Sequence, residues 1–280
     1  MIAGAGGNIG AQVGHSGIVV VDTGAAGSAD KVIAALRQIS DKPVRYIINT
    51  SADADHVGGN AAVAKSGQSI ITEVVGNALS LGVMSNNGAA SVLAHDNVLA
   101  RLTQGDSSIW PTKTYTANHY KMSLNGEGIE VVHQPSAHSD GDSVVVFRRA
   151  NVIVTGDVYD PTKFPVIDRQ RGGTIQGTLR ALNWLLEMTI PPYPQPWLPE
   201  RTYLIPGHGP VSDSPDLLEY RDMVTIVRDV IQDLINEGKT LAQVKAADPT
   251  LGYNARYGGA GGKDAFVTAI YEDLTAKTGR

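Results

Sequence analysis

Two kinds of hydrophobic pattern alternate along the chain. Continuous runs of β-branched and aliphatic residues, such as residues 18–21, predict buried strands. Apolar residues at three- and four-residue spacing, as from Val32 to Ile39, predict amphipathic helices. The runs predict strands at residues 18–21, 44–48, 70–71, 122–124, 128–133, 143–147, 152–154 and 203–205. The spacing predicts helices from a Ser28 or Asp30 cap to Ile39, from Val57 to Ala64 with an end at Gly67, over 74–102 with a break at 86–88, over 175–188 and over 217–235.

This order of elements places strand blocks in both halves of the chain, with helices between them. Such an arrangement favours sheets covered by helices, and therefore a mixed α/β fold. The prolines within residues 191–196 predict an extended connection before the last strand. No segment has the composition of a flexible linker. We therefore expect one domain over residues 1–213 and a helical C-terminal extension over 214–280, packed on the same domain.

Composition excludes several classes of protein. The chain has 280 residues, 28 acidic against 23 basic side chains, a formal charge of -5 and no Cys. Without Cys there is no disulfide framework, zinc finger, iron–sulfur cluster or thiol nucleophile. No run of Lys and Arg is present, which argues against a nucleic-acid or anionic-membrane surface. No apolar run approaches the roughly 18 residues that a membrane span needs.

The N-terminus bears on the cellular compartment. Its first seven residues lack the basic start and apolar stretch of a secretory signal, which favours the cytoplasm for the chain as given. The sequence nevertheless begins abruptly in glycine just before an expected strand. If the N-terminus has been shortened, a periplasmic or secreted protein is equally compatible with a chain that has no Cys.

The first stretch with candidate chemistry is the polar segment 49–60. It directly follows an expected strand, and α/β folds place their sites at strand ends. Ser51, Asp53 and Asp55 alternate, so in an extended turn they project to the same side. Asp55 and His56 then offer two metal-capable groups at the start of a helix. Taken alone, these residues fit an Asp-rich helix cap equally well.

Three later segments change this interpretation. His138 lies in a loop before the strand 143–147, Asp157 follows the strand 152–154, and His208 follows the strand 203–205 between two glycines. Four strand–loop junctions of one chain therefore each deliver a His or an Asp. Imidazole and carboxylate ligands on such loops are typical of a hydrolytic zinc site.

In this order, the four segments resemble the metallo-β-lactamase superfamily, which includes class B β-lactamases and glyoxalase II. The first motif of that family is T-H-x-H-x-D-H-x-G-G, and residues 50–59 read T-S-x-D-x-D-H-x-G-G. The later ligand motifs are similar to the segments around His138, Asp157 and His208, and residues 20–24 match the opening strand and turn. The resemblance covers about residues 8–210. It implies an αββα sandwich over residues 1–213, with the site between two sheet edges.

The resemblance also implies a ligand set. Asp55, His56 and His208 would hold the second of two metal ions, with Asp157 available as a bridge. The first site keeps His138 and Asp157, while Ser51 and Asp53 stand where the family motif has two His.

A hydroxyl is a weak ligand, and a carboxylate adds negative charge that lowers the Lewis acidity of the metal and raises the pKa of its water. Zinc accepts such oxygen ligands, but harder ligands shift the preference towards Mn or Fe. Two outcomes stay open. The chain is mononuclear at the second site, or it keeps a weaker first metal on Asp53, His138 and Asp157, with Ser51 as a further candidate ligand.

The expected function is a metal-dependent hydrolase of a carbonyl-centred bond in a β-lactam, lactone or thioester. Asp53 and Asp55 are the expected catalytic residues, with Asp53 as general base towards a water. Tyr159, Lys163 and Arg171 are candidate substrate contacts, Arg171 at a helix start suited to anions. The expected partner is a small-molecule substrate rather than nucleic acid or membrane, and the chain is a monomer or homodimer. The alternative is a non-catalytic ligand-binding or sensor protein that retains the fold and one metal site.

Overall fold

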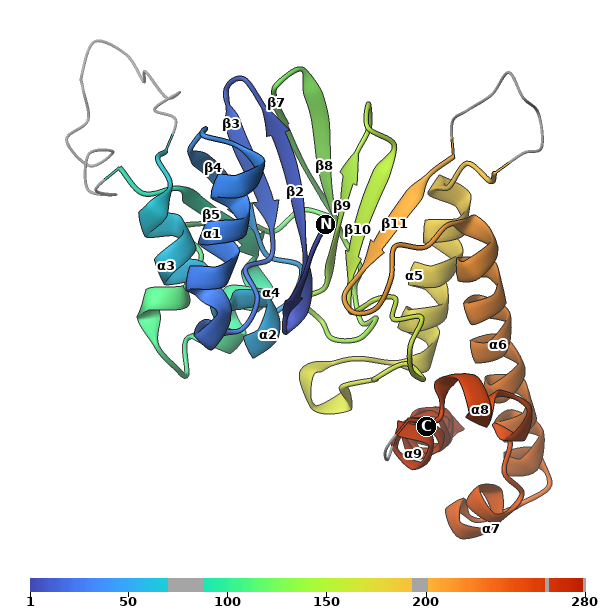
Figure 1. Ribbon diagram of the computed structural model, residues 1–280. Coiled ribbons are helices and arrows are strands. Elements are labelled where there is room, and N and C mark those ends of the chain that lie inside the picture. Colours follow the sequence, from blue (N-terminus) through green and yellow to red (C-terminus); the bar gives the residue numbers. More distant parts are fainter. Residues whose placement is uncertain (70–87, 193–200, 260–261, 279–280) are drawn as a thin grey trace. The chain divides into compact units, whose positions relative to one another are not determined.

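The computed structural model describes residues 1–69, 88–192, 201–259 and 262–278. The chain divides into two compact units (Figure 1). The first contains residues 1–132 and 145–150, and the second contains residues 133–144 and 151–280. Among the described residues, no helix combines the length and the apolar character that crossing a membrane requires.

The first unit is built on a six-stranded sheet with the order β1-β2-β3-β4-β5-β6. The strands are β1 (Ile2–Ala5), β2 (Gly7–Gly14), β3 (Gly17–Val21), β4 (Val44–Ile48), β5 (Ser91–His95) and β6 (Lys113–Tyr115). The first three pair antiparallel, and β3 to β6 pair parallel. All five residues of β3 are buried, as expected for a strand covered on both faces.

Helices and their apolar side chains cover this sheet. They are η1 (Ala26–Ser28), α1 (Ala29–Ile39), α2 (Ala54–Val57), α3 (Asn60–Ser66), α4 (Asp96–Leu102) and η3 (Ser107–Ile109). Val32 and Leu36 of α1 pack with Ile18, Val20 and Ile47 of the strands in one core cluster. The apolar residues of α2 and α4 form a separate cluster. Two clusters on one sheet are expected, because alternate residues of a strand point to opposite faces of the sheet.

A second sheet has the strand order β11-β10-β9-β8-β7. Its strands are β7 (His119–Leu124), β8 (Glu127–His133), β9 (Ser143–Phe147), β10 (Val152–Gly156) and β11 (Tyr203–Pro206). β7 and β8 pair antiparallel, whereas β10 and β11 pair parallel. Because β10 and β11 run in the same direction, the residues that follow them emerge at the same edge of the sheet.

Besides β10 and β11, the second unit consists mostly of helices. They are η4 (Arg169–Arg171), α5 (Ile175–Met188), α6 (Ser214–Asn236), α7 (Leu241–Ala246), η5 (Leu251–Tyr253), α8 (Asn254–Tyr257) and α9 (Gly262–Thr278). α6 begins at a capping box formed by Asp213 and Asp216 and packs against α5 and α9. Phe164 stacks on Phe266 with the ring centroids 5.3 Å apart, which joins α9 to the loop after β10.

Most of the elements predicted from the sequence are confirmed, and one is wrong. Residues 91–95 were expected in a helix but form β5, which pairs with β4 and β6 and is almost fully buried. A short apolar run fits a buried strand and a buried helix equally well, and here the pairing partners decide. The expected helical segments at 74–87, the strand at 70–71 and part of the proline-rich connection lie outside the described residues. β1 and β2 were not predicted, because their many glycines weaken a strand pattern.

Candidate metal centre

The first group of candidate ligands lies in the loop between β4 and α3 of the first unit. Its start is tied to the sheet, because the N–H of Asn49 donates to the carbonyl of Leu93 at 2.9 Å. Asp53 precedes the first residue of α2 but makes no capping hydrogen bond to that helix. The side chain of Asp53 therefore does not cap α2. A role in helix capping, the simplest structural explanation of an Asp at this position, does not apply.

His56 is held by a buried carboxylate. Its side chain is 0% exposed, and its Nδ1 lies 2.8 Å from Oδ2 of Asp22. Asp22 also accepts the N–H of Thr50 at 2.8 Å and the Thr50 hydroxyl at 2.6 Å. A carboxylate accepts hydrogen bonds, so the proton of the imidazole lies on Nδ1 and the lone pair on Nε2. Metal-ligating histidines characteristically have such a carboxylate behind them.

The glycines at the N-terminus allow the backbone to approach this loop closely. A Cβ at Gly7 would lie 3.1 Å from the ring of His56, and a Cβ at Gly6 would lie 2.9 Å from Cβ of Asp55. Gly6 also has φ +103, a conformation that residues with a side chain rarely adopt. The turn between β1 and β2 therefore requires glycine, because it packs against two candidate ligands, Asp55 and His56.

A second buried network fixes the other end of the loop. Asn60, which is 1% exposed, donates to Oδ1 of Asn49 at 2.8 Å and to the carbonyl of Ile109 at 2.8 Å. Its own Oδ1 accepts from Thr23 at 2.9 Å and from Asn49 at 3.1 Å. These bonds join the ends of β3 and β4 to the start of α3, so the backbone on both sides of His56 is fixed.

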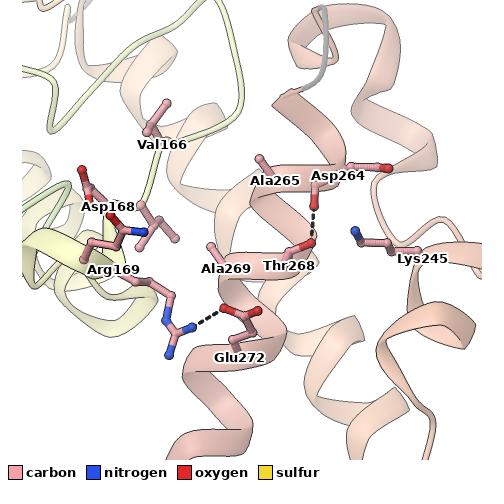
Figure 2. A pocket seen from close by; sticks show the side chains of 11 residues that line it. Val166, Asp168, Arg169, Lys245, Asp264, Ala265, Thr268, Ala269 and Glu272 are labelled. Atoms are coloured by element: carbon pink, nitrogen blue, oxygen red, sulfur yellow. Dashed lines mark hydrogen bonds and ion pairs between the residues drawn. The ribbon is translucent and has the colours of Figure 1, made fainter.

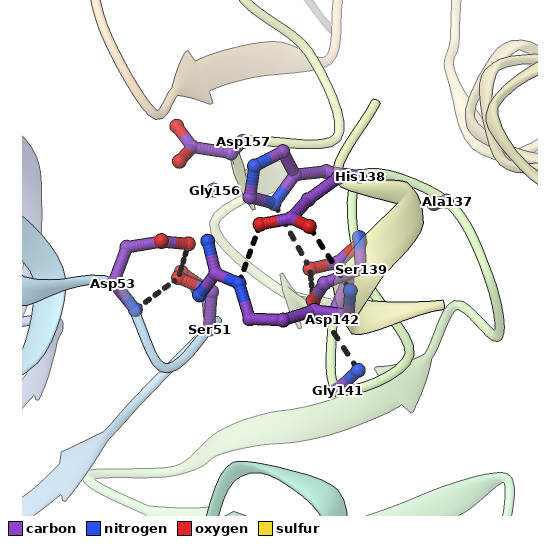
Figure 3. A network of polar contacts seen from close by, with 12 residues as sticks. Ser51, Asp53, Ala137, His138, Ser139, Gly141, Asp142, Gly156 and Asp157 are labelled. Atoms are coloured by element: carbon purple, nitrogen blue, oxygen red, sulfur yellow. Dashed lines mark hydrogen bonds and ion pairs between the residues drawn. The ribbon is translucent and has the colours of Figure 1, made fainter. Parts of the chain in front are cut away.

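Ser51 and Asp53, which depart from the family motif, contact one another (Figure 3). The hydroxyl of Ser51 donates to Oδ2 of Asp53 at 3.0 Å and accepts the N–H of Asp53 at 3.2 Å. Ser51 is buried and Asp53 is half-buried. The pair therefore orients the carboxylate where the family motif has two imidazoles.

In the second unit, His138 lies in the loop after β8. Nδ1 of His138 lies 3.5 Å from Oδ1 of Asp142, and both side chains are buried. Asp142 in turn accepts the N–H and the hydroxyl of Ser139, each at 2.7 Å (Figure 3). His138 thus has a carboxylate beside Nδ1, as His56 does.

Asp157 and His208 follow the parallel strands β10 and β11. Nε2 of His208 lies 3.4 Å from Oδ1 of Asp157. The N–H of Gly207 donates to the carbonyl of Gly156 at 2.9 Å, which joins the two strand ends. A Cβ at Gly207 would lie 2.3 Å from Oδ1 of Asp157, so only glycine fits there. Asp157 and His208 are therefore brought together at the ends of β10 and β11.

The three candidate substrate contacts have different surroundings. Tyr159 is 0% exposed, and its ring packs edge-on against Tyr220 with the centroids 5.1 Å apart. Burial raises the pKa of the Tyr159 hydroxyl far above its usual value. A substrate contact by Tyr159 would therefore require this ring to leave the core.

Lys163 and Arg171 lie nearer the surface. Nζ of Lys163 lies 3.2 Å from Asp160, and Nε of Arg171 donates to Oδ2 of Asp168 at 2.6 Å. Although burial alone would raise it, the pKa of the Asp168 carboxyl is lowered, because Arg171 bonds that carboxyl with its side chain and its backbone N–H. Asp168 also donates its N–H to the carbonyl of His138 at 2.9 Å, so this loop borders a candidate ligand.

The second unit also contains an open cavity of about 890 Å³ (Figure 2). Its walls are formed by residues 166–170, by Lys245 of α7 and by one side of α9. Arg169 and Glu272, on opposite walls, form an ion pair. Acidic, basic and apolar side chains mix along the lining, which therefore does not select one chemical class of ligand. No candidate site residue is among those that line it.

Comparison with known proteins identifies the family. The model of the metallo-beta-lactamase superfamily matches residues 4–208, well over half of the chain. The chain therefore belongs to the metallo-beta-lactamase superfamily, as the motifs indicated. No curated protein matches the chain.

Solved structures share the fold at low sequence identity. A stereoselective inverting sec-alkylsulfatase, Pisa1, from Pseudomonas sp. is 17% identical, with a TM-score of 0.68, over 95% of this chain and 47% of that chain. A metallo-beta-lactamase from Pontibacter korlensis is 14% identical, with a TM-score of 0.55, over 78% of this chain and 94% of that chain. The chain thus spans about half the length of the alkylsulfatase that it matches. The expected fold class, α/β of the metallo-β-lactamase type with two sheets and helices, is confirmed.

Two sets of residues were underestimated from the sequence. Asp22 was noted only as part of the opening strand and turn, although it holds His56. Gly6 and Gly7 lie in the glycine-rich N-terminus, and their close approach to Asp55 and His56 was not predicted. Asp and Gly are common in ordinary turns, so the local pattern carried no signal that either set contacts a candidate ligand.

Proposed function

We propose that the chain is a metal-dependent hydrolase that binds its metal through the His and Asp residues of the superfamily motifs. The observation that carries the proposal is that His56 and His138 each have a buried carboxylate beside Nδ1. Such carboxylates orient an imidazole with its Nε2 lone pair towards a metal ion. The superfamily and the chemistry of these donors therefore agree, since His and carboxylate are the ligands of hydrolytic zinc.

In this proposal the six candidate ligands form two groups. Asp55, His56 and His208 hold one ion, and Asp53, His138 and Asp157 hold a second or assist the first. Zinc suits the first group, which contains two imidazoles. The second group is richer in carboxylate, so Mn or Fe competes better with Zn there. Ser51 acts chiefly through Asp53, to which its hydroxyl donates.

When bound, a divalent ion supplies Lewis acidity that polarises the scissile carbonyl and lowers the pKa of water. The proposed task of Asp53 is to move a proton. A water oxygen adds to the carbonyl carbon, and the proton of that water passes to the Asp53 carboxylate. The proton then goes to the leaving nitrogen, oxygen or sulfur as its bond to carbon breaks. The Ser51 hydroxyl holds the Asp53 carboxylate in one orientation for this transfer.

Substrate selection in this proposal falls to Lys163 and Arg171, which suit an anionic group of the substrate. Each already pairs with a carboxylate, Asp160 or Asp168, so a substrate anion must compete with that partner. Their proposed contribution to binding is therefore small. Tyr159 contributes only if its buried ring moves.

The substitution of two motif His by Ser51 and Asp53 favours one alternative, a non-catalytic sensor that retains the fold and one metal site. The retention of His138 and Asp157 in addition to Asp55, His56 and His208 supports the enzyme, since a sensor with one metal site needs no ligands beyond that site.

A panel of substrates distinguishes the two. The full chain is assayed with a chromogenic cephalosporin, a lactone, a thioester and, because an alkylsulfatase shares the fold, a secondary alkyl sulfate. Activity that is lost with chelator and restored by Zn, Mn or Fe supports the hydrolase. Metal binding without turnover on any member supports the sensor.

The role of Asp53 has a separate test. Asp53→Asn keeps the size of the side chain but removes its basicity, and we expect turnover to fall by about 10²–10⁴-fold while the ion held by Asp55, His56 and His208 is retained. A chain with two zinc ions, one bound directly by Asp53, would reject the role of general base. The paired change Ser51→His with Asp53→His restores the family motif and is the matched comparison.

A further inference from the structure

The helix α9 lies outside residues 4–208, the part of the chain that matches the superfamily, yet it contacts the start of α5. The contact is made by Asp273, a carboxylate that is 6% exposed. Its Oδ2 accepts the N–H of Ile175, the first residue of α5, at 3.1 Å. The first N–H groups of a helix have no partner within the helix, and a carboxylate there also interacts favourably with the helix dipole.

The first turn of α5 in turn holds the loop that carries His138. The N–H of Thr174 donates to the carbonyl of Ser136 at 3.0 Å. The hydroxyl of Thr178 donates to the carbonyl of Ala137 at 3.2 Å. The approach is so close that a Cβ at Gly177 would lie 1.6 Å from the oxygen of Ser136. The two residues before His138 are therefore fixed to the first turn of α5.

We infer that Asp273 is a positioning residue for His138. The chain of contacts runs from the Asp273 carboxylate through the start of α5 to the carbonyls of Ser136 and Ala137. Without the carboxylate, the N–H of Ile175 is left in a buried place without its acceptor, and the first turn of α5 relaxes. The backbone before His138 then moves with that turn. This inference rests on the proposed function, in which His138 binds metal.

A second link between α9 and this region allows a comparison. Glu272, the neighbour of Asp273, pairs with Arg169 of η4. Both side chains are more than a third exposed, Glu272 at 49% and Arg169 at 35%. Exposed pairs contribute little because water and salt screen them. The inference therefore assigns positioning to Asp273 and not to Glu272.

The test is the zinc affinity of the full chain, measured by competition with a chromogenic chelator. Asp273→Ala is expected to weaken binding about tenfold, the lower end of what loss of an outer-shell partner costs. Asp273→Asn is expected to recover most of the affinity, because the amide oxygen accepts the same N–H. Glu272→Gln is the matched neighbour and is expected to bind as the wild type does.

Two further variants separate positioning from general loss of stability. Ile270→Ala, a buried change on the same helix, is expected to lower the melting temperature without changing zinc affinity. Thr178→Val removes the next link while leaving Asp273 in place, and is expected to weaken zinc binding as Asp273→Ala does. Unchanged affinity in Asp273→Ala and Thr178→Val, or an equal loss in Ile270→Ala, would overturn the inference. A wild-type chain that binds no metal would instead overturn the proposed function, and the inference with it.

Discussion

Asp22→Asn exchanges one buried carboxylate oxygen for an NH₂ group without changing the size of the side chain. The backbone tolerates the exchange, because Asn adopts the positive φ of +62 found at Asp22 as readily as Asp does. What changes is the pattern of donors. Oδ1 accepts from the N–H of Thr50, and Oδ2 accepts from the Thr50 hydroxyl and from His56.

Neither orientation of the Asn side chain satisfies all of these partners. In one orientation the amide oxygen of the introduced Asn faces the N–H of Thr50, and the amide NH₂ group faces Nδ1 of His56. The imidazole must then carry its proton on Nε2, the atom that would bind a metal. With the side chain flipped, the NH₂ group faces a buried N–H. Loss of the charge-assisted bond costs about 1.5–3 kcal/mol of stability. Loss of an outer-shell carboxylate weakens metal binding by about 10–100-fold.

The assay is zinc affinity by chelator competition, with thermal unfolding of the metal-free chain measured in parallel. Thr50→Val is the control, since it removes the 2.6 Å hydroxyl contact to Asp22 but leaves the Asp22–His56 bond. We expect Asp22→Asn to lose affinity by at least about tenfold and Thr50→Val to lose much less. Equal affinities in Asp22→Asn and the wild type would refute the reasoning that the carboxylate sets the tautomer of His56.

Three further outcomes follow from the second unit. Gly207→Ala places a Cβ 2.3 Å from Oδ1 of Asp157, so we expect reduced metal binding and a loss of about 1–3 kcal/mol in unfolding free energy, measured by denaturant titration. Phe164→Ala removes a ring that is 1% exposed and should cost about 3–5 kcal/mol by the same measurement, whereas a loss below about 1 kcal/mol would contradict the assigned core. Arg171→Gln tests the lowered pKa of Asp168. The Arg171–Asp168 pair stabilises the fold above the pKa of the unfolded Asp carboxyl, about 3.9. This stabilisation is lost as the pH falls through the lower pKa of Asp168 in the folded state. The difference between this variant and the wild type should therefore be largest near neutral pH, below about 1 kcal/mol for a partly exposed pair, and should vanish in acid; a difference that grows in acid would contradict the assignment.

Much of the fold was predictable because its strands are continuous apolar runs between turns. β3, β4, β9 and α5 were all expected at or near their observed bounds. Failures occurred where the local signal was weak. β5 is a short apolar run that only its neighbours identify as a strand, and β1 with β2 contains glycines that serve close packing against Asp55 and His56.

The candidate ligands could be predicted from motifs, but the residues that hold those ligands in place could not. Nothing local links Asp22 to His56, which lie 34 positions apart, because their contact depends on how the loop after β4 folds back on the end of β3. The contact between Asp273 and Ile175 joins residues 98 positions apart. Contacts between residues so far apart in the sequence cannot be predicted from the local hydrophobic and polar pattern.

The metal content of the full chain, purified without chelator, tests the central claim most directly. The account expects the wild type to retain at least one Zn, Mn or Fe ion per chain, and expects His56→Ala and His138→Ala each to retain less while remaining folded. A folded wild type without metal, or folded variants that both retain the wild-type content, would contradict the claim that the candidate ligands bind metal.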